Sequence, residues 1–258
     1  MPWTNGEPLQ AVDRAIRVLL YLASDEARGE SGVSDIAKGT GLPKATVHRL
    51  LRAFSPHRFV EQNPETGKYR LSWGVFEVGN KVPGVIGLKM AARPEMASLC
   101  EISRETVNLA VRDGTDAVLI DKVDSNQLLR LELEIGRREP LHATALGKAL
   151  LCEFGKDALA GVFGPEPWPA VTPSTIQTLA GFAAALEAVR RDGYATDNEE
   201  FSVNIRCVGA PIRNHTHRVI AAISVSGPAH RFPADRAKEV APAVVQAAKN
   251  ISKLLGHG

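Results

Sequence analysis

The 258-residue sequence lacks the features of a membrane protein, a secreted protein or a metalloprotein. It has no run of eighteen apolar residues, which argues against a membrane-spanning helix. The N-terminal residues Met1–Gly6 lack the basic and apolar regions of a signal peptide. The three cysteines, Cys100, Cys152 and Cys207, are odd in number, far apart and without metal-ligand spacing. We therefore expect a reduced cytoplasmic protein that has no contact with a membrane and uses no cofactor and no metal.

Signals of catalysis are also missing. No nucleophile elbow, phosphate-binding loop or zinc-protease motif occurs. Cys207, His142 and Asp197 have the chemistry of a nucleophile, a base and an orienting acid, but they are far apart in the sequence. His215 and His217 have no third metal ligand nearby in the sequence. We expect that the protein is not an enzyme.

Length and composition predict two domains. A chain of 258 residues is longer than a typical single domain, and its 44% hydrophobic content is enough for two cores. The net charge of +2 and the pI of about 8.5 are too mild to indicate nucleic-acid binding by themselves. We predict one domain over residues 1–72, a helical linker over 73–91 and a second domain over 92–258.

Residues 34–52 have the layout of a helix-turn-helix. Ser34 can cap a short helix, and Gly39 and Gly41 can form a tight turn after it. Pro43 stands where a second helix would begin, a position at which its missing N–H costs nothing. The pattern is typical of proteins that place the second helix in the DNA major groove.

The second helix of this motif is expected to be amphipathic. Val47, Leu50 and Leu51 recur at helical spacing and form an inner stripe, and residues 11–22 form a supporting first helix. Between Lys38 and Arg70 there are seven lysines and arginines but only two acidic residues. The predicted contacts of this helix with DNA are Lys44, Ala45, Thr46, His48, Arg49 and Arg52.

A β-wing is expected directly after the helix-turn-helix. Two strand-like runs, 59–62 and 68–71, flank an Asn-Pro turn that Gly67 can close with a positive φ. A hairpin at this place would bring Lys68 and Arg70 to the phosphate backbone. Three helices and this hairpin predict a winged helix.

The remaining sequence predicts a mixed α/β domain with a mainly antiparallel sheet. Thr144 can cap one of its helices, and Pro94 is expected to kink or open another. The expected strands are residues 106–112, 117–123, 128–135, 193–196, 205–212 and 219–226. The expected helices are residues 73–79, 85–104, 145–154, 175–192 and 233–255.

Five blocks carry a resemblance to a known family: residues 41–51, 140–149, 193–200, 206–212 and 221–228. In these blocks and over nearly its whole length, the chain is similar to transcription regulators of the isocitrate lyase regulator (IclR) family. The resemblance implies an α+β protein with an N-terminal winged helix-turn-helix and a C-terminal GAF-like effector-binding domain. It also implies a homodimer that assembles further into a homotetramer, a dimer of dimers.

The C-terminal residues suggest where an effector would bind. Ser224 and Ser226 lie two apart on one strand and share a face, as do Ile205 and Cys207 on another. The amides of residues 145–147 lie at an expected helix start, where free N–H groups favour an anion. A small carboxylate held by these amides and hydroxyls would need neither a metal nor an arginine.

The resemblance implies a specific set of effector-pocket positions. Ala145 replaces a glycine common in the family, and Leu146 is larger than usual, so the pocket would be smaller or favour an apolar part of the ligand. The resemblance assigns Leu128 and Leu131 to an apolar wall. The other implied positions are Ala145, Leu146, Asp197, Ile205, Cys207, Ser224 and Ser226.

We therefore predict a DNA-binding repressor of a catabolic operon. Its winged helices would read a near-palindromic, double-stranded operator, and a small organic acid in the C-terminal domain would change their placement through residues 73–104. One alternative is a redox-responsive regulator of the same fold that uses Cys207 or Cys152. Another is an enzyme that uses the C-terminal pocket.

Overall fold

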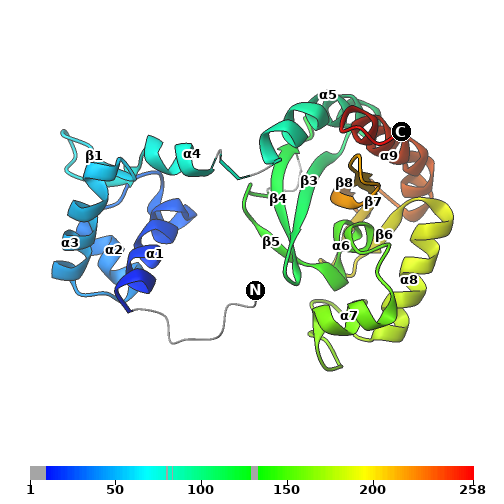
Figure 1. Cartoon of the computed structure of the whole chain (residues 1–258), viewed down its shortest axis with the longest axis horizontal. Coiled ribbons are helices and arrows are strands. Elements are labelled where there is room, and N and C mark those ends of the chain that lie inside the picture. Colours follow the sequence, from blue (N-terminus) through cyan, green and yellow to red (C-terminus); the bar gives the residue numbers. More distant parts are fainter. Residues whose placement is uncertain (1–9, 80, 83, 129–132) are drawn as a thin grey trace. The chain divides into compact units, whose positions relative to one another are not determined.

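The computed structural model describes residues 10–79, 81–82, 84–128 and 133–258. The chain divides into two compact units, Met1–Pro83 and Gly84–Gly258, each drawn in Figure 1. This division falls inside the linker predicted over residues 73–91. Among the described residues no helix is both long enough and apolar enough to cross a membrane.

The N-terminal unit is a helix-turn-helix followed by a two-stranded wing, as the sequence predicted. Strands β1 and β2 are antiparallel, and Glu61 lies opposite Arg70. The elements are α1 (Gln10–Ala23), α2 (Val33–Thr40), α3 (Lys44–Phe54), β1 (Val60–Gln62), β2 (Tyr69–Leu71) and α4 (Trp73–Gly79), with short 3₁₀ helices at Asp25–Ala27 and Ser55–His57.

The core of this unit comes from the apolar stripes of its three helices. Val18, Ile36 and Val47 are completely buried, so α1, α2 and α3 contribute to one cluster. Gly39 lies against the ring of Tyr21, and a side chain at position 39 would collide with that ring. Gly41 then ends α2 with a φ of 69°, in the left-handed region that glycine adopts readily.

Two local expectations in this unit need correction. Ser34 does not cap α2, because the helix begins one residue earlier at Val33 and Gly32 is its N-cap. Gly39 belongs to α2 rather than to the turn, and its small size serves helix packing instead.

The C-terminal unit is built on a six-stranded sheet in the order β5-β4-β3-β8-β7-β6. Every neighbouring pair is antiparallel, as the sequence predicted. The strands are β3 (Thr106–Asp113), β4 (Asp116–Val123), β5 (Arg138–Pro140), β6 (Ala195–Asn198), β7 (Ile205–Arg213) and β8 (Val219–Pro228).

Helices cover both faces of this sheet and create two apolar layers (Figure 1). Helices α5 and α9 pack on one face, and α6, α7 and α8 pack on the other. The α+β class expected from the sequence is therefore confirmed. The helices are α5 (Val85–Ser103), α6 (Ala145–Leu150), α7 (Lys156–Phe163), α8 (Leu179–Asp192) and α9 (Ala234–Leu254), with a 3₁₀ turn at Leu141–Ala143.

Some expected elements in this unit differ from the structure. Residues 133–135 are not in a strand, and residues 129–132 of the expected strand lie outside the described residues. The helix after Thr144 ends at Leu150 rather than at Phe154. Helix α5 runs through Pro94 without interruption. The short strand β5 and helix α7 were not predicted from the sequence.

Candidate functional site

Helix α3 presents its basic side to solvent. Val47 and Leu51 are completely buried and fix which face of the helix turns inward. The short helix therefore holds a cluster of side chains on its outer face, several of them hydrogen-bond donors. Of the predicted DNA contacts on α3, Thr46 is half-buried, and the exposed ones are Lys44, Ala45, His48, Arg49 and Arg52.

The wing adds two exposed cations with different surroundings. Lys68 has no ion pair among the described residues, whereas Arg70 Nε lies 2.6 Å from Glu61 Oε1 on the opposite strand. Hydrogen bonds from Ser72 and Arg70 lower the pKa of Glu61 below its usual range. A phosphate at Arg70 would compete with this carboxylate, so Lys68 is the freer of the two.

A cavity of about 240 Å³ lies in the C-terminal unit, on the face of the sheet that α6 covers. We name it the Ser224 cavity. It is smaller than most pockets for drug-sized ligands, which occupy roughly 300–1,000 Å³. Its lining residues are Leu133, Arg137, Glu139, Thr144, Ala145, Leu146, Asp197, Phe201, Ser202, Ile205, Cys207, Ser224 and Ser226.

Strand pairing brings the polar side of this cavity together. Asp197 on β6 lies opposite Cys207 on β7, which in turn lies opposite Ser226 on β8. Gly209 lies opposite Ser224, and a Cβ atom at Gly209 would be 3.4 Å from the backbone carbon of Ala145. The missing side chain at position 209 thus lets the start of α6 approach strands β7 and β8.

Asp197 is an almost completely buried acid in this wall. It is 2% exposed, and its Oδ1 accepts a 2.7 Å hydrogen bond from the amide of Glu200. Burial raises the pKa of Asp197 from 3.8 to about 7, although the backbone hydrogen bond and Lys148 oppose the rise. The carboxyl therefore changes its charge close to neutral pH.

Ser224 contributes a hydroxyl that no protein group satisfies. The residue is 1% exposed, and its Oγ has no hydrogen-bond partner among the described residues. Asn108 Oδ1 on the neighbouring strand is in the same condition, while Asn108 Nδ2 donates to Ser226 Oγ at 3.1 Å. Buried polar groups nearly always have partners, so an unpaired hydroxyl in a cavity wall indicates a place for a polar ligand.

Two charged residues of the cavity were missed by the sequence reasoning. Glu139 on β5 is 6% exposed, and burial raises its pKa above the usual range, partly offset by Arg137. The Nε atom of Arg137 lies 3.7 Å from Glu139 Oε1, and its guanidinium lies 5.7 Å from the ring centre of Phe201. In the sequence, nothing distinguishes Arg137 and Glu139 from ordinary charged surface residues.

The other predicted effector positions fall into two groups. Leu128 is fully exposed and does not line the cavity, which corrects the predicted apolar wall; Leu133 contributes to that wall instead. Leu131 lies outside the described residues. The predicted residues that the structure brings to the cavity are Ala145, Leu146, Asp197, Ile205, Cys207, Ser224 and Ser226.

The start of α6 differs from the expected set of three free amides. Thr144 caps the helix, as predicted, and its Oγ1 accepts a 3.0 Å hydrogen bond from the amide of Gly147. The Gly147 amide is therefore occupied. Ala145 and Leu146 are the two amide-bearing residues of this turn that line the cavity.

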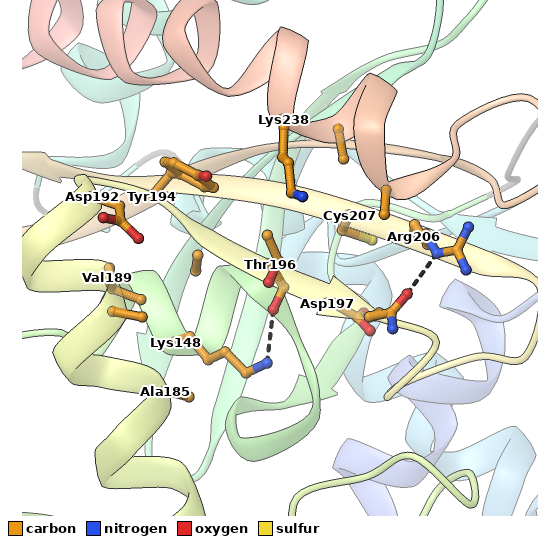
Figure 2. Close-up of a pocket in the computed structure, with 15 residues that line it drawn as sticks. Lys148, Ala185, Val189, Asp192, Tyr194, Thr196, Asp197, Arg206, Cys207 and Lys238 are labelled. Carbon is orange, nitrogen blue, oxygen red and sulfur yellow. Dashed lines mark hydrogen bonds between the residues drawn. The ribbon is translucent and has the colours of Figure 1, made fainter.

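A second cavity of about 360 Å³, the Lys148 cavity, lies at the β6 edge of the sheet between α8 and the start of α9 (Figure 2). It shares Asp197 and Cys207 with the Ser224 cavity. Lys148 is buried here and donates to Thr196 O at 2.7 Å and to both carboxylate oxygens of Glu200. This ion pair fixes the loop that follows β6 and thereby the position of Asp197.

The residues considered for catalysis or metal binding are not assembled into such a site. His142 does not line the Ser224 cavity, and its Nε2 lies 2.9 Å from Pro169 O. Burial raises the pKa of the Cys207 thiol well above its usual range, which disfavours the reactive thiolate. Among the described residues, no group of three histidine, cysteine or acidic side chains is placed to hold a metal ion.

The fold and these two sites define a class of protein, in which a winged helix-turn-helix unit is joined to an α/β unit with a small polar cavity. Two family models match this division. The IclR helix-turn-helix domain matches residues 11–64, and the bacterial transcriptional regulator IclR C-terminal model matches residues 81–253. The chain belongs to the IclR family of transcriptional regulators, as its resemblance indicated.

The curated relatives that match nearly the whole of this chain are transcriptional regulators. The HTH-type transcriptional regulator XynR of Escherichia coli strain K12 is 34% identical over 249 residues, which cover 96% of this chain and 98% of that protein. The HTH-type transcriptional repressor AllR of Salmonella typhimurium is 37% identical over 253 residues, which cover 98% and 92%.

Solved structures share the fold of this chain. The IclR protein of Thermotoga maritima has 26% identity and a TM-score of 0.79, and the match covers 96% of this chain and 100% of that one. An IclR homolog from Microbacterium hydrocarbonoxydans, complexed with 4-hydroxybenzoate, has 24% identity and a TM-score of 0.82, with coverage of 95% and 98%.

Proposed function

We propose that this protein represses a catabolic operon by binding a near-palindromic operator and that a small organic acid in the Ser224 cavity controls the binding. The observation that carries the proposal is the presence, in one chain, of an exposed basic recognition helix and a buried polar cavity with an unpaired hydroxyl at Ser224. A DNA partner also agrees with the cytoplasmic location expected from the sequence.

The recognition helix is proposed to enter the major groove. Arg49 and Lys44 are exposed donors that suit guanine edges, and Lys68 on the wing suits a phosphate. Regulator relatives with the same helix-turn-helix support this role. Whether the acid releases or strengthens the repressor depends on which arrangement of the winged helices it favours.

The proposed effector is small because the cavity is small. An acid would accept hydrogen bonds from Ser224, from Ser226 and from the free amides at the start of α6. The neighbour that was crystallised with 4-hydroxybenzoate supports an organic acid as the ligand class. Arg137 adds a cation that the sequence reasoning had not required.

A homodimer is proposed because α1 carries an apolar stripe on its outer face. Val12, Ile16 and Leu20 are spaced by four residues and at least half exposed. A second copy would bury this stripe and set two recognition helices side by side on one operator. The further step to a dimer of dimers is proposed from the family resemblance.

The alternatives receive less support. A redox sensor based on Cys207 needs an accessible thiolate, and burial opposes one there. An enzyme that uses Cys207 would need a base such as His142, which is held at Pro169 instead. We therefore propose no catalytic role.

The proposal is tested with the double variant Ser224→Ala, Ser226→Ala. An operator selected from random DNA by the purified protein is titrated in matched salt, with and without 4-hydroxybenzoate and a series of aliphatic acids. We expect the double variant to keep the wild-type operator affinity but to need at least tenfold more acid for the same response. Ser174→Ala, an exposed serine outside the cavity, is the matched control. An unchanged acid response in the double variant would show that the cavity is not the effector site.

A further inference from the structure

The Ser224 cavity has more acidic lining than a plain carboxylate ligand would need. Glu139 and Asp197 both face it, while Arg137 is the one cation among the described residues that line it. An anion that met only these groups would bring a third carboxylate close to two others. The ligand must therefore carry other groups that pair with the acids.

Both acids keep unused hydrogen-bonding capacity. No hydrogen bond to the Glu139 carboxylate occurs among the described residues, and Arg137 contacts it only at 3.7 Å. Asp197 uses Oδ1 for the amides of Glu200 and Phe201. A buried carboxylate oxygen without a hydrogen bond is costly, so a ligand that supplies one gains affinity.

The remaining polar groups of the cavity determine which chemical group of a ligand fits best. The hydroxyls of Ser224 and Ser226 can donate or accept, and Arg137 can only donate. A ligand hydroxyl serves both kinds of group, because it donates to a carboxylate and accepts from a serine or an arginine. An ammonium group has no acceptor for those donors, and an alkyl chain pairs with none of them.

Burial makes the same wall tolerant of an anion. Burial, with a smaller contribution from the charge of Glu200, raises the pKa of Asp197 to about 7, although the backbone hydrogen bond and Lys148 oppose the rise. Burial also raises the pKa of Glu139 against the effect of Arg137. Near neutral pH Asp197 therefore repels a ligand carboxylate less than an ordinary acid would.

We propose that the effector is a short-chain acid with several hydroxyl groups, whose carboxylate pairs with Arg137 and whose hydroxyls donate to Glu139 and Asp197. This inference rests on the proposed role of the Ser224 cavity as the effector site. It assigns Glu139 and Arg137 as the residues that determine effector specificity.

The test compares acids of one carbon skeleton by calorimetry on the full-length protein at neutral pH. Butanoate, 3-hydroxybutanoate, 2,3-dihydroxybutanoate and 2,3,4-trihydroxybutanoate differ only in their hydroxyls, and threonine replaces the 2-hydroxyl of the dihydroxy acid with an ammonium group. We expect the trihydroxy acid to bind at least tenfold more tightly than butanoate, with the monohydroxy acid between them. Threonine is expected to bind more weakly than the dihydroxy acid.

The variant Glu139→Gln tests the specificity residue. It keeps the size of the side chain but removes the charge that strengthens the hydroxyl hydrogen bond. The preference for trihydroxybutanoate over butanoate is expected to fall at least threefold, while operator affinity without ligand stays unchanged. Glu101→Gln, an exposed acid on α5, is the control and should retain the full preference.

Three results would overturn the inference. In the wild-type protein, which needs no folding control, butanoate could bind as tightly as the trihydroxy acid, or threonine as tightly as the dihydroxy acid. Binding of 4-hydroxybenzoate with no binding of the trihydroxy acid would also reject the inference, but it would leave the proposed effector cavity intact. If none of these acids bound or changed operator affinity, the inference and the proposed function would both fail.

Discussion

At the scale of single residues, Asp197 connects the main features of the C-terminal unit. It lines both cavities and stands beside the buried pair of Lys148 and Glu200. Its carboxyl is held in place by the amide of Glu200 and kept from water by the sheet. A buried acid in a ligand-sized cavity is typical of a functional position, where binding outweighs a cost in stability.

That cost can be measured through pH. The pKa of Asp197 lies near 3.8 in the unfolded chain and at about 7 in the folded protein. Between these two pH values Asp197 is protonated in the folded protein but ionised in the unfolded chain. The free energy of unfolding therefore falls as the pH rises. We expect Asp197→Asn, which cannot ionise, to gain roughly 2–4 kcal/mol relative to wild type between about pH 4 and about pH 8.

Urea unfolding at both pH values measures this difference. Asp192→Asn is a suitable control, because Asp192 is an acid at the end of α8 whose pKa is lowered by Arg191 rather than raised by burial. An Asp197→Asn variant with the same pH dependence as wild type would show that the carboxyl is ionised without cost in the folded protein.

At the scale of elements, α3 and the wing make different contributions to DNA binding. Arg49 on the outer face of α3 is proposed to read bases, whereas Lys68 on the wing is proposed to contact phosphate. We expect Arg49→Ala to weaken operator binding by about 1–3 kcal/mol and to leave binding to random DNA nearly unchanged.

The wing variant should behave in the opposite way. Lys68→Ala is expected to weaken binding to operator and random DNA alike and to reduce the salt dependence by about one counterion. Fluorescence anisotropy at several salt concentrations separates the two effects, with Lys253→Ala, an exposed cation at the end of α9, as the control. Equal losses on both DNAs for Arg49→Ala would contradict the assignment of α3 as the sequence reader.

The elements that could be predicted from the sequence are those with strong local signals. Helix α3 has an inner stripe, the wing has Asn63 and Gly67 at its turn, and Thr144 has the chemistry of a cap. Strand β8 is a buried and largely apolar run, and β7 is a partly buried one. Each of these depends on neighbours in the chain rather than on distant contacts.

The parts that could not be predicted depend on long-range packing. The alternating pattern from Leu128 resembles a strand, yet Leu128 is fully exposed and the sheet continues instead with the three residues of β5. Glu139 enters the cavity because β5 pairs with β4 at Ala117, a register that no local pattern encodes. The charged part of the site was therefore missed, while the serine-bearing part was found.

At the scale of the whole molecule, one chain is proposed to be both a DNA reader and a ligand sensor. The two activities lie in separate units, each with its own core. If acid binding affects operator binding, the coupling between them must be reciprocal. The acid then changes the operator affinity by the same factor by which the operator changes the acid affinity.

The most direct measurement is the closed binding cycle of the full-length protein. Operator affinity is measured with and without saturating 2,3,4-trihydroxybutanoate, or 4-hydroxybenzoate if that acid binds more tightly, and acid affinity is measured with and without operator. We predict that both ratios agree and amount to about tenfold, within the usual range of coupling energies. Acid binding that stays the same on free and operator-bound protein would contradict the claim that the Ser224 cavity controls DNA binding.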